Sequence, residues 1–436
     1  MDDKIILKNS NTILENDVYF PPKEEIDYAE LVVNNYHDKE TLFIKNDADE
    51  IIAFRSKTYN ENKINNSKPI ITISNEMPSY AKEGDFWIIP SEPSIVTFET
   101  TEENQTIKIT NNASAFRYIE INGESVELPT NELTYTFTEI GEHSINVELN
   151  ENILYLNSLF EGCVNLTSVS EDIFKNCTIN TSFEKTFKDC VNLKEIPNGL
   201  FDYNTMVQSF ASAFENCEKL TSIPSDLFKY NVNTIDFSRI FSNCISLTSI
   251  PNTLFGGMIK ATNFSYIFEN CTGITNGIPS DLFTKCISAI NFEGAFYKCK
   301  NINGDISGKL FEHSNKAENF SKLFYQCENI ISVKTAIFDT CLNVKTFNST
   351  FFECLKLSAI PKYIFSNCVN VTDFENTFNG CSELFELSPR DAVFGNEKPL
   401  YERNSNEGYT QVTNHGKCFY NCINLTDYQT IPESWK

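Results

Sequence analysis

From about residue 150 to the end of the chain, apolar residues return in the same order roughly every 27 residues. One copy begins with Phe183, continues with Phe187 and Cys190, and then has Leu193 and Ile196 before a proline. Two Phe four residues apart, with Cys three residues later, predict one face of a short helical turn. The Leu-x-x-Ile step predicts a short strand that ends at the proline, because proline has no amide to donate to a ladder.

Ten copies of this unit align between residues 150 and 436. A single copy cannot bury its own apolar face, so the copies are expected to stack and share one core. The sequence therefore predicts an α/β solenoid of about ten coils. The residues expected to form its inner columns in the clearest copies are Phe187, Cys190, Phe214, Cys217, Phe241, Cys244, Phe268 and Cys271.

An insertion at about 389–416 breaks the period near the end of this array. Cys381 and Cys422 lie 41 residues apart, where the neighbouring copies keep 27 or 28. The inserted segment is polar and contains Tyr401 and Tyr409. Two interpretations stay open: a loop that covers the end of the solenoid, or a loop that contacts a ligand, since irregular loops on a rigid scaffold often carry binding residues.

The first 149 residues have a different pattern and contain no cysteine. Residues 93–149 alternate apolar and polar positions in short runs separated by turn signals, which predicts a small β-sandwich, immunoglobulin-like in the loose sense. Such modules are more often spacers than binding domains. We therefore expect a multi-domain chain: a mostly-β N-terminal part made of a module at 1–92 and a spacer at 93–149, followed by the solenoid at 150–436.

The charge balance excludes one class of partner. The chain has 35 Lys and Arg against 59 Asp and Glu, a formal net charge of −24. Such an excess of carboxylates repels a phosphate backbone, so we expect no nucleic-acid ligand. The longest apolar run near the N-terminus is Ile5–Leu7, and no stretch approaches the roughly 20 apolar residues of a membrane span. We expect neither general secretory export nor membrane insertion.

The cysteines and histidines suggest structural roles rather than chemistry. The 15 cysteines are an odd number and follow the repeat, so we expect buried free thiols in a chain made in a reducing compartment. His415, Cys418 and Cys422 offer three ligands where structural zinc needs four. No nucleotide-binding or hydrolase motif is present. We expect no catalytic residue, cofactor or metal, although a carboxylate pair that cleaves glycosidic bonds stays open.

The Phe-x-x-Cys-x-x-Leu-x-x-Ile-Pro unit resembles the BspA-type leucine-rich repeats, over about residues 151–436. These repeats occur in many bacterial surface proteins, adhesins and mobile-element proteins, and the resemblance implies a generic binding surface. The segment over about 5–57 resembles the N-terminal module of tailed-phage fibre proteins. The residues in which it matches are Ile6, Leu7, Lys8, Tyr28, Glu30, Leu31 and Asn34.

A second element supports the likeness to phage fibres. Residues 77–87 read Met-Pro-Ser-Tyr-Ala-Lys-Glu-Gly-Asp-Phe-Trp and resemble the Pro-x(5)-Gly-Asp-x-Trp element of phage fibre and tail-appendage proteins. In such fibres the N-terminal part attaches to the particle, often as a trimer, and the C-terminal part faces outward. The resemblance implies a homo-oligomer, trimer favoured over dimer, that contacts phage capsid or tail proteins in a virion assembled in the host cytoplasm.

These observations lead to one hypothesis and two alternatives. The hypothesis is a non-enzymatic head- or tail-attached fibre whose repeats bind a host-surface glycan or protein through tyrosines, because aromatic rings provide large contact area at low entropy cost. The candidate ligand-binding residues are Tyr203, Tyr230, Tyr266, Tyr297, Tyr325, Tyr363, Tyr401 and Tyr409. The alternatives are a bacterial cell-surface adhesin with the same repeats and a polysaccharide-degrading fibre enzyme.

Overall fold

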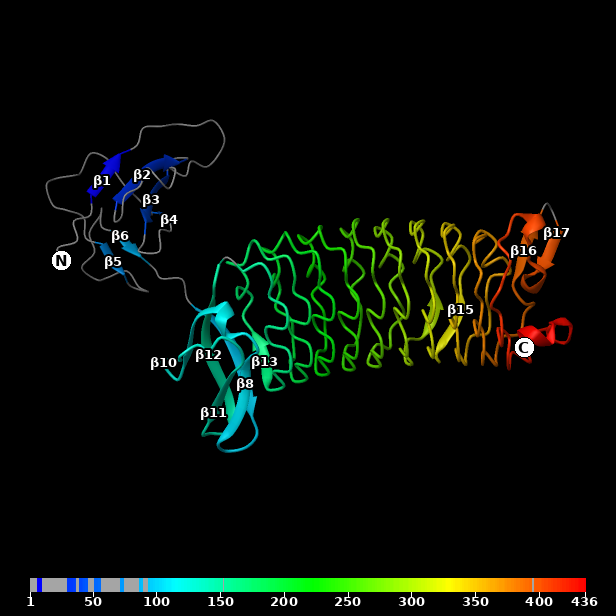
Figure 1. Ribbon diagram of the computed structural model, residues 1–436, viewed down its shortest axis with the longest axis horizontal. Helices are drawn as coiled ribbons and strands as arrows, with labels where there is room; N and C mark the ends of the chain where they lie inside the picture. The colour runs from blue at the N-terminus through cyan, green and yellow to red at the C-terminus, as the bar shows by residue number, and fades with distance from the viewer. Residues whose placement is uncertain are drawn as a thin grey trace. The chain divides into compact units, whose positions relative to one another are not determined.

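A computed structural model describes six strands within the first 92 residues, and residues 93–436 apart from 152, 394 and 395. The chain divides into two compact units, 1–92 and 93–436 (Figure 1). The strands of the first unit form a four-stranded sheet in the order β1-β2-β3-β4 and a parallel pair β5-β6. Their bounds are β1 Ile6–Asn9, β2 Glu30–Tyr36, β3 Lys39–Lys45, β4 Ile51–Arg55, β5 Ile71–Ile73 and β6 Phe86–Ile88.

The second unit begins with two small sheets. A five-stranded sheet has the order β10-β9-β12-β7-β13, and β11 pairs with β8 in a second sheet. Alternate residues of β7 and of the second half of β12 are buried, as the alternation of the sequence predicts, and β7 buries Thr97 in addition. The bounds are β7 Ser94–Thr100, β8 Gln105–Thr110, a 3₁₀ turn η3 Ala113–Ala115, β9 Phe116–Ile121, β10 Glu124–Ser125, β11 Leu133–Phe137 and β12 Gly141–Leu149.

The segment 93–149 is not a separate spacer, which corrects the expected domain boundary near 150. The fifth strand of its larger sheet is β13 Leu166–Val169, which belongs to the first repeat copy and pairs antiparallel with β7. The Cys163 thiol donates to the carbonyl of Ile109 at 3.5 Å, as the cysteines of later copies do to the preceding copy. Buried residues from both parts form one hydrophobic core. Residues 93–149 therefore cover the first end of the repeat stack.

The repeat copies lie side by side in parallel (Figure 1). The residue before the first Phe of each copy forms a parallel bridge to its counterpart one copy later, 27 or 28 residues away for most pairs. Its side-chain oxygen accepts the amide two residues on, for example Asp236 from Ser238 at 2.8 Å and Asn263 from Ser265 at 3.2 Å. Such short turns need Ser, Thr, Asn or Asp, which explains the residue type at this position in most copies. Here the repeat geometry directly determines a polar position.

The segment that spans the two Phe is not a helical turn, which corrects the expectation from their spacing. No α-helix occurs among the described residues. In the copy with Phe183 and Phe187, the residues Lys185 and Asp189 have φ angles of 58° and 60°. The same two positions have positive φ in all ten copies, through 158 and 162 to 417 and 421. A left-handed residue at every fourth position excludes a right-handed helix but still brings the two Phe to the same side.

Hydrogen bonds between copies support this backbone. The amides of every second residue in the segment, from Phe183 to Asp189, donate to the next copy at 2.8–3.0 Å. The acceptors are the carbonyls of Ser209, Ala211, Ala213 and Glu215. A left-handed residue costs roughly 1–2 kcal/mol, whereas each such hydrogen bond contributes about 0.5–1.5 kcal/mol net. The conformation is stable only in the stack, because the acceptors belong to a neighbouring copy.

The Leu-x-x-Ile step forms a hydrogen-bonded strand in only some copies. β13 and β15 Ile330–Val333 coincide with this step, and β15 pairs in parallel with β14 Gly304–Ile306. In most other described copies this step is not part of a regular strand. The unit as a whole is therefore β-rich, with small sheets and many turns.

Phe and Cys form continuous inner columns, as predicted. Phe187, Phe214, Phe241 and Phe268 are fully buried, and consecutive rings stack with centroids 5.3–5.7 Å apart. Cys190, Cys217, Cys244 and Cys271 are buried free thiols that donate to a Phe carbonyl of the preceding copy at 3.0–3.2 Å. A small polarizable side chain with a weak donor fits this position. The thiols thus join neighbouring copies without disulfides.

The insertion forms a hairpin and two 3₁₀ turns over the last copies. Their bounds are β16 Arg390–Val393, β17 Asn396–Pro399, η4 Leu400–Glu402 and η5 Ser405–Glu407. Arg403 is buried and donates at 2.9 Å to the carbonyls of Phe365 and Cys368. In an earlier copy, the buried amide of Asn204 donates to the equivalent carbonyls of Phe174 and Cys177. Arg403 therefore replaces the hydrogen bonds that the next copy would otherwise supply.

Two 3₁₀ turns close the described chain, η6 Tyr428–Thr430 and η7 Glu433–Trp435. The carbonyl of Trp435 accepts the amide of Phe419 at 2.8 Å, where an interior copy would bond to the next one. The Trp435 ring stacks on His415 at 4.6 Å and lies 6.2 Å from Phe419. Both ends of the stack are therefore covered by other parts of the second unit.

Candidate binding surface

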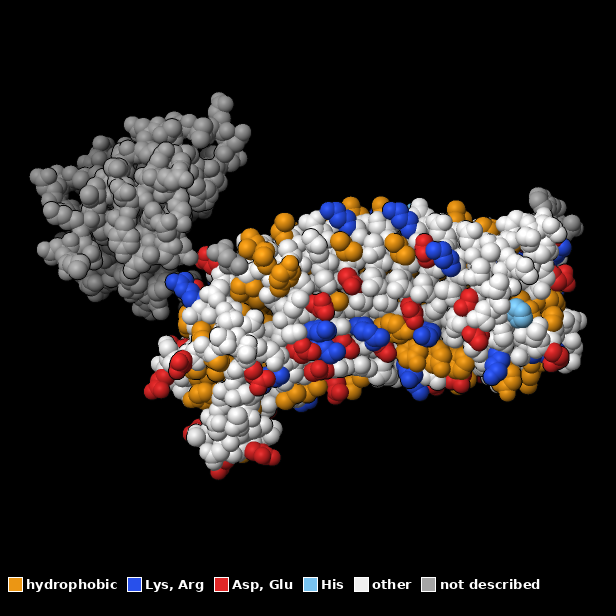
Figure 2. Space-filling view, in the orientation of Figure 1, with side chains coloured by type: hydrophobic (Ala, Val, Ile, Leu, Met, Phe, Trp, Pro, Cys, Tyr) orange, Lys and Arg blue, Asp and Glu red, His pale blue; other side chains and the backbone are white. Residues whose placement is uncertain are grey.

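The outward side chains around the two Phe of each copy form one face of the stack, which we call the network face. They are the residues at the first, second, fifth and sixth positions after the first Phe, together with the bridge residue before it. Figure 2, in the orientation of Figure 1, shows acidic and basic side chains gathered over one part of the repeat stack, and hydrophobic side chains beside them towards the C-terminal copies. Ion pairs between neighbouring copies include Lys188–Glu215 at 3.1 Å and Arg239–Glu269 at 2.5 Å.

Three aromatic residues at the same repeat position form a ladder along this face. Tyr297 stacks on Tyr325 with centroids 4.7 Å apart, and Tyr325 stacks on Phe352 at 4.5 Å. All three are partly exposed. Since each ring covers a face of its neighbour, the ladder offers mainly ring edges and tyrosine hydroxyls to a ligand. Stacking of sugars on the faces of Tyr297 and Tyr325, the mode expected for a glycan, does not fit this arrangement.

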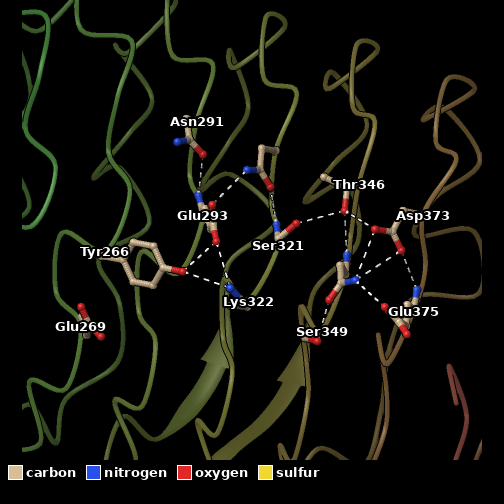
Figure 3. A network of polar contacts seen from close by, with 12 residues as sticks. Tyr266, Glu269, Asn291, Glu293, Ser321, Lys322, Thr346, Ser349, Asp373 and Glu375 are labelled. Carbon is tan, nitrogen blue, oxygen red and sulfur yellow. Dashed lines mark hydrogen bonds and ion pairs between the residues drawn. The ribbon is translucent and has the colours of Figure 1, made fainter. Parts of the chain in front are cut away.

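Tyr266 lies at the start of the ladder and is held on all sides. Its ring is 6.0 Å from Tyr297 in an edge contact, and the Arg239 guanidinium lies over it at 4.4 Å. Its hydroxyl donates to Glu293 at 2.7 Å and accepts from Lys322 at 3.2 Å (Figure 3). Gly294 makes room for the ring, since a Cβ there would clash with it. These contacts fix one orientation of the ring across several copies.

The charges of this cluster support one another. Burial favours a raised pKa for Glu293, but hydrogen bonds from Tyr266 and Lys322 outweigh it and lower the pKa. Burial likewise opposes the charged form of Lys322, yet the hydrogen bonds to Glu293 and Tyr266 raise its pKa. The pKa of Tyr266 is raised by burial and by its bond to Glu293. Near neutral pH the cluster therefore contains a carboxylate, an ammonium and a neutral phenol.

A polar network continues from this cluster towards the C-terminus (Figure 3). Asn319 donates to Glu293 at 3.4 Å, and the Ser321 and Thr346 hydroxyls lie 3.0 Å apart. Asn348 then donates to Asp373 at 3.3 Å and to Glu375 at 3.1 Å. The network positions hydrogen-bonding groups before any ligand arrives, which lowers the entropy cost of binding.

The other predicted tyrosines lie elsewhere. Tyr203 and Tyr230 are exposed on a different edge of the stack, at equivalent positions of neighbouring copies. Tyr363 is exposed, and its hydroxyl donates to Glu397 of the insertion, which also pairs with Lys362 at 2.6 Å. The structure thus brings together only Tyr266, Tyr297 and Tyr325 from the eight candidates.

Two tyrosines of the insertion belong to its packing. Tyr409 is buried, its ring lies 4.4 Å from the Arg403 guanidinium, and its hydroxyl donates to the carbonyl of Ser366 at 3.3 Å. The prediction that Tyr409 contacts a ligand is therefore wrong, because its ring is inaccessible. Tyr401 is partly buried and lies 6.5 Å from Trp435. Of the two interpretations of the insertion, these contacts favour the loop that covers the stack.

Several residues of the network face were not among the candidates predicted from the sequence. Arg239, Glu293 and Lys322 surround Tyr266, and Phe352 completes the ladder. An alignment of the copies by repeat position would have revealed the ladder, since Tyr297, Tyr325 and Phe352 share one position. The cluster around Tyr266 joins different repeat positions, and no local sequence signal connects them.

The candidate attachment residues of the first unit lie on two neighbouring strands. Ile6 pairs with Glu30, Leu7 with Leu31 and Lys8 with Val32 in the parallel register of β1 and β2. Asn34 lies further along β2. Tyr28 lies outside the described residues, as do most residues of the Pro-x(5)-Gly-Asp-x-Trp element. The backbone thus places the other six candidates on two paired strands.

The possible zinc ligands do not form a site. His415 stacks on Trp435, and its Nδ1 lies 3.0 Å from the carbonyl of Ser434. Cys422 donates to the carbonyl of Phe378 at 2.9 Å, and burial raises its pKa to about 12. Within the described part of the chain, no group of three or more His, Cys, Asp or Glu side chains could hold a metal ion. None of the helices described there is long and apolar enough to cross a membrane.

The chain matches no protein-family model and no curated protein. Among solved structures it has a weak likeness to the crystal structure of a TLR13–ssRNA13 complex, a leucine-rich-repeat protein. The sequence identity is 9%, the TM-score is 0.12, and the match covers 58% of this chain and 51% of that one. This chain therefore spans about half the length of that relative. So low a score carries no argument about fold or function.

Proposed function

We propose that the repeat copies are a BspA-type leucine-rich-repeat solenoid of about ten coils, which acts as a rigid binding module. Ten copies in phase, with a shared core and parallel bridges one period apart, support this assignment. We further propose that the whole chain is a structural, non-enzymatic protein of a tailed-phage particle, either a head- or a tail-attached fibre. The support for this step is the resemblance of residues 5–57 and 77–87 to phage fibre proteins.

In this proposal the first unit docks on capsid or tail proteins through the paired strands β1 and β2, and copies of the chain associate as a homo-oligomer. The second unit then presents the network face to the host cell. Residues 93–149 add to this role by covering the first end of the stack rather than by acting as a flexible spacer. The protein would be located in the virion.

The single observation that carries the binding role is the aromatic ladder beside the Tyr266 cluster. Interface hot spots are enriched in Tyr, Trp and Arg held in fixed positions. Here Tyr297, Tyr325 and Phe352 stack in one row, and Lys298 lies 5.1 Å over the ring of Tyr297. The edges, hydroxyls and charges of this row suit a polar partner, either a glycan bound through its hydroxyls or a protein surface.

Two measurements test the proposal. The first is immunogold labelling of purified particles with antibody against residues 150–436. Label on the particle supports a virion component, and its position decides between head and tail. Bare particles, with label on intact bacterial cells, would contradict the fibre and favour the adhesin.

The second measurement is binding of the purified chain to host cells, with and without Tyr325→Ala and Phe352→Ala. We expect the double variant to bind at least tenfold more weakly, since hot-spot aromatics contribute about 2 kcal/mol or more each. Tyr420→Ala is the matched control, because Tyr420 is exposed at the same repeat position of the last copy and lies outside the ladder. Equal loss in both variants would contradict the ladder as the site. Release of soluble sugar from host polysaccharide would favour the enzyme instead.

A further inference from the structure

A row of apolar side chains on another edge of the stack has no partner among the described residues of the chain. This edge stripe lies where the chain turns after the second Phe-containing half of each copy, before the bridge residue of the next copy. Its nine residues expose between 40% and 59% of their surface. They are Ile179, Tyr203, Met206, Tyr230, Val232, Ile235, Ile259, Ile287 and Ile290.

The stripe is continuous, because its members occupy the same few repeat positions in consecutive copies. Val232, Ile259 and Ile287 follow one another at 27 and 28 residues. Hydrogen bonds hold these turns together: Asn233 donates to the carbonyl of Thr205 at 2.9 Å, and Lys260 donates to Asn233 at 2.6 Å. The apolar side chains therefore form a line along the stack with one or more members in each copy.

Later copies of the same chain provide an internal control. At the positions of Val232 and Ile235, the copy that follows Ile287 has Asn315 and Glu318. Lys345 occupies the second of these positions in the copy after that. These polar residues occur on the same backbone with the same hydrogen bonds, for example Asn343 to the carbonyl of Asn315 at 2.8 Å. The fold therefore does not require apolar residues on this edge, and the stripe needs another explanation.

We infer that a second copy of this chain covers the edge stripe, in a side-by-side dimer with two-fold symmetry. The nine residues are each about half exposed, so together they offer an accessible surface on the order of 800 Å². One partner in a stable protein interface buries an area of this size. None of the nine is charged, so the contact brings few charges together in a chain of net charge −24.

The repeat spacing explains why the partner is another copy. The ridges of the stripe recur with the spacing of the coils, roughly 4.8 Å if they follow the strand spacing of a sheet. A partner can fill every groove between them only if its own ridges have the same spacing, which an identical stripe provides. A two-fold contact uses the same patch on both copies and closes after two. End-to-end stacking is not available, because residues 93–149 and Trp435 cover the ends of the stack.

The test is the mass of the full chain in solution by sedimentation equilibrium, over a range of micromolar concentrations. We expect the unaltered chain to have twice the mass of one copy. Ile259→Asp places a charge in the middle of the stripe, so we expect it to be monomeric over the same range, with at least tenfold weaker association. Ile287→Lys, with the opposite charge, should have the same effect.

Leu342→Asp is the matched control. Leu342 occupies the repeat position of Ile259 and is 52% exposed, but Asn315 separates it from the stripe. We expect this variant to remain a dimer. Circular dichroism melting should show all three variants folded, because each altered side chain is exposed. A monomeric unaltered chain would overturn the inference. The inference would also be overturned if the chain formed an oligomer of any size, for instance a trimer through residues 1–92, and Ile259→Asp left its mass unchanged. The inference does not depend on the proposed phage role, which the labelling of particles tests separately.

Discussion

The inward and outward sides of the Phe-containing segment share one backbone but follow different rules. On the inward side, nearly every copy has Phe and Cys at the same positions, and all are buried. On the outward side, equivalent positions hold residues as different as Lys188, Glu269 and Tyr297. The stack constrains a side chain only where the neighbouring copies enclose it. Outward residues are free to vary, so a cluster such as Tyr266 with Glu293 and Lys322 points to function, whereas the Phe columns do not.

The largest expected effect is a loss of folding stability at high pH, which comes from the buried cysteine thiols of the inward side. Burial raises the pKa of Cys163, Cys177 and Cys299 to about 12, from 9.0 for an exposed thiol, and the pKa values of Cys190 and Cys217 shift in the same direction. Below pH 9 the thiols are protonated in both states, so their contribution to stability is intact. Between pH 9 and 12 the unfolded chain loses protons that the folded chain keeps, so stability falls by roughly 1.4 kcal/mol per pH unit for each thiol.

We therefore expect cooperative unfolding as the pH rises from 9 towards 12. Circular dichroism would follow the fold, and ultraviolet absorbance would follow the thiolates. Thiolates should appear together with unfolding and not before it. Thiolate absorbance that rises near pH 9 while the fold persists would show that the inner column is open to solvent.

A pair of adjacent residues compares the two sides directly. Phe351 is fully buried and stacks between Phe324 at 5.6 Å and Phe378 at 5.4 Å. Phe352 is partly exposed, and its one ring contact among the described residues is with Tyr325. We expect Phe351→Ala to reduce the free energy of unfolding by about 3–5 kcal/mol and Phe352→Ala by about 1 kcal/mol. Urea denaturation measures both, and similar losses would contradict the distinction between the sides.

The last prediction concerns the loss of stability when a residue of the outward side, Gly294, is replaced. A Cβ at Gly294 would clash with the Tyr266 ring, and Gly294 has a φ of 58°. We expect Gly294→Ala to cost about 1–3 kcal/mol, from the clash together with the left-handed backbone. Tyr266→Ala in the same chain should remove the part that comes from the clash.

Gly408→Ala is the control for the backbone contribution. Gly408 has a φ of 85°, and no atom lies within 4 Å of the Cβ position. Its loss should therefore be about 1 kcal/mol and independent of Tyr266. If Tyr266→Ala does not lessen the effect of Gly294→Ala, the ring does not occupy the space beside Gly294.

Sequence reasoning was accurate where one period repeats one environment. It predicted the buried columns of Phe187 and Cys190 and their counterparts, and the free thiols. It was wrong about the helical turn, because Phe residues four apart lie on one side both in a helix and in this run of turns with left-handed residues. It also separated residues 93–149 from the array, although β7 and β13 form one sheet. The pairing joins segments of unlike pattern, which periodicity cannot reveal.

The sequence by itself determined the period, the number of copies and which side chains face inward, because burial against a neighbour demands the same residue types in each copy. Only the tertiary structure decided the backbone between the two Phe, since its left-handed residues depend on hydrogen bonds to carbonyls one copy away. The tertiary structure also decided that Tyr297 and Tyr325 meet Phe352 in a ladder while Tyr409 is buried under Arg403. Such contacts depend on how the copies stack and where the insertion folds back, and neither can be predicted from a local sequence pattern.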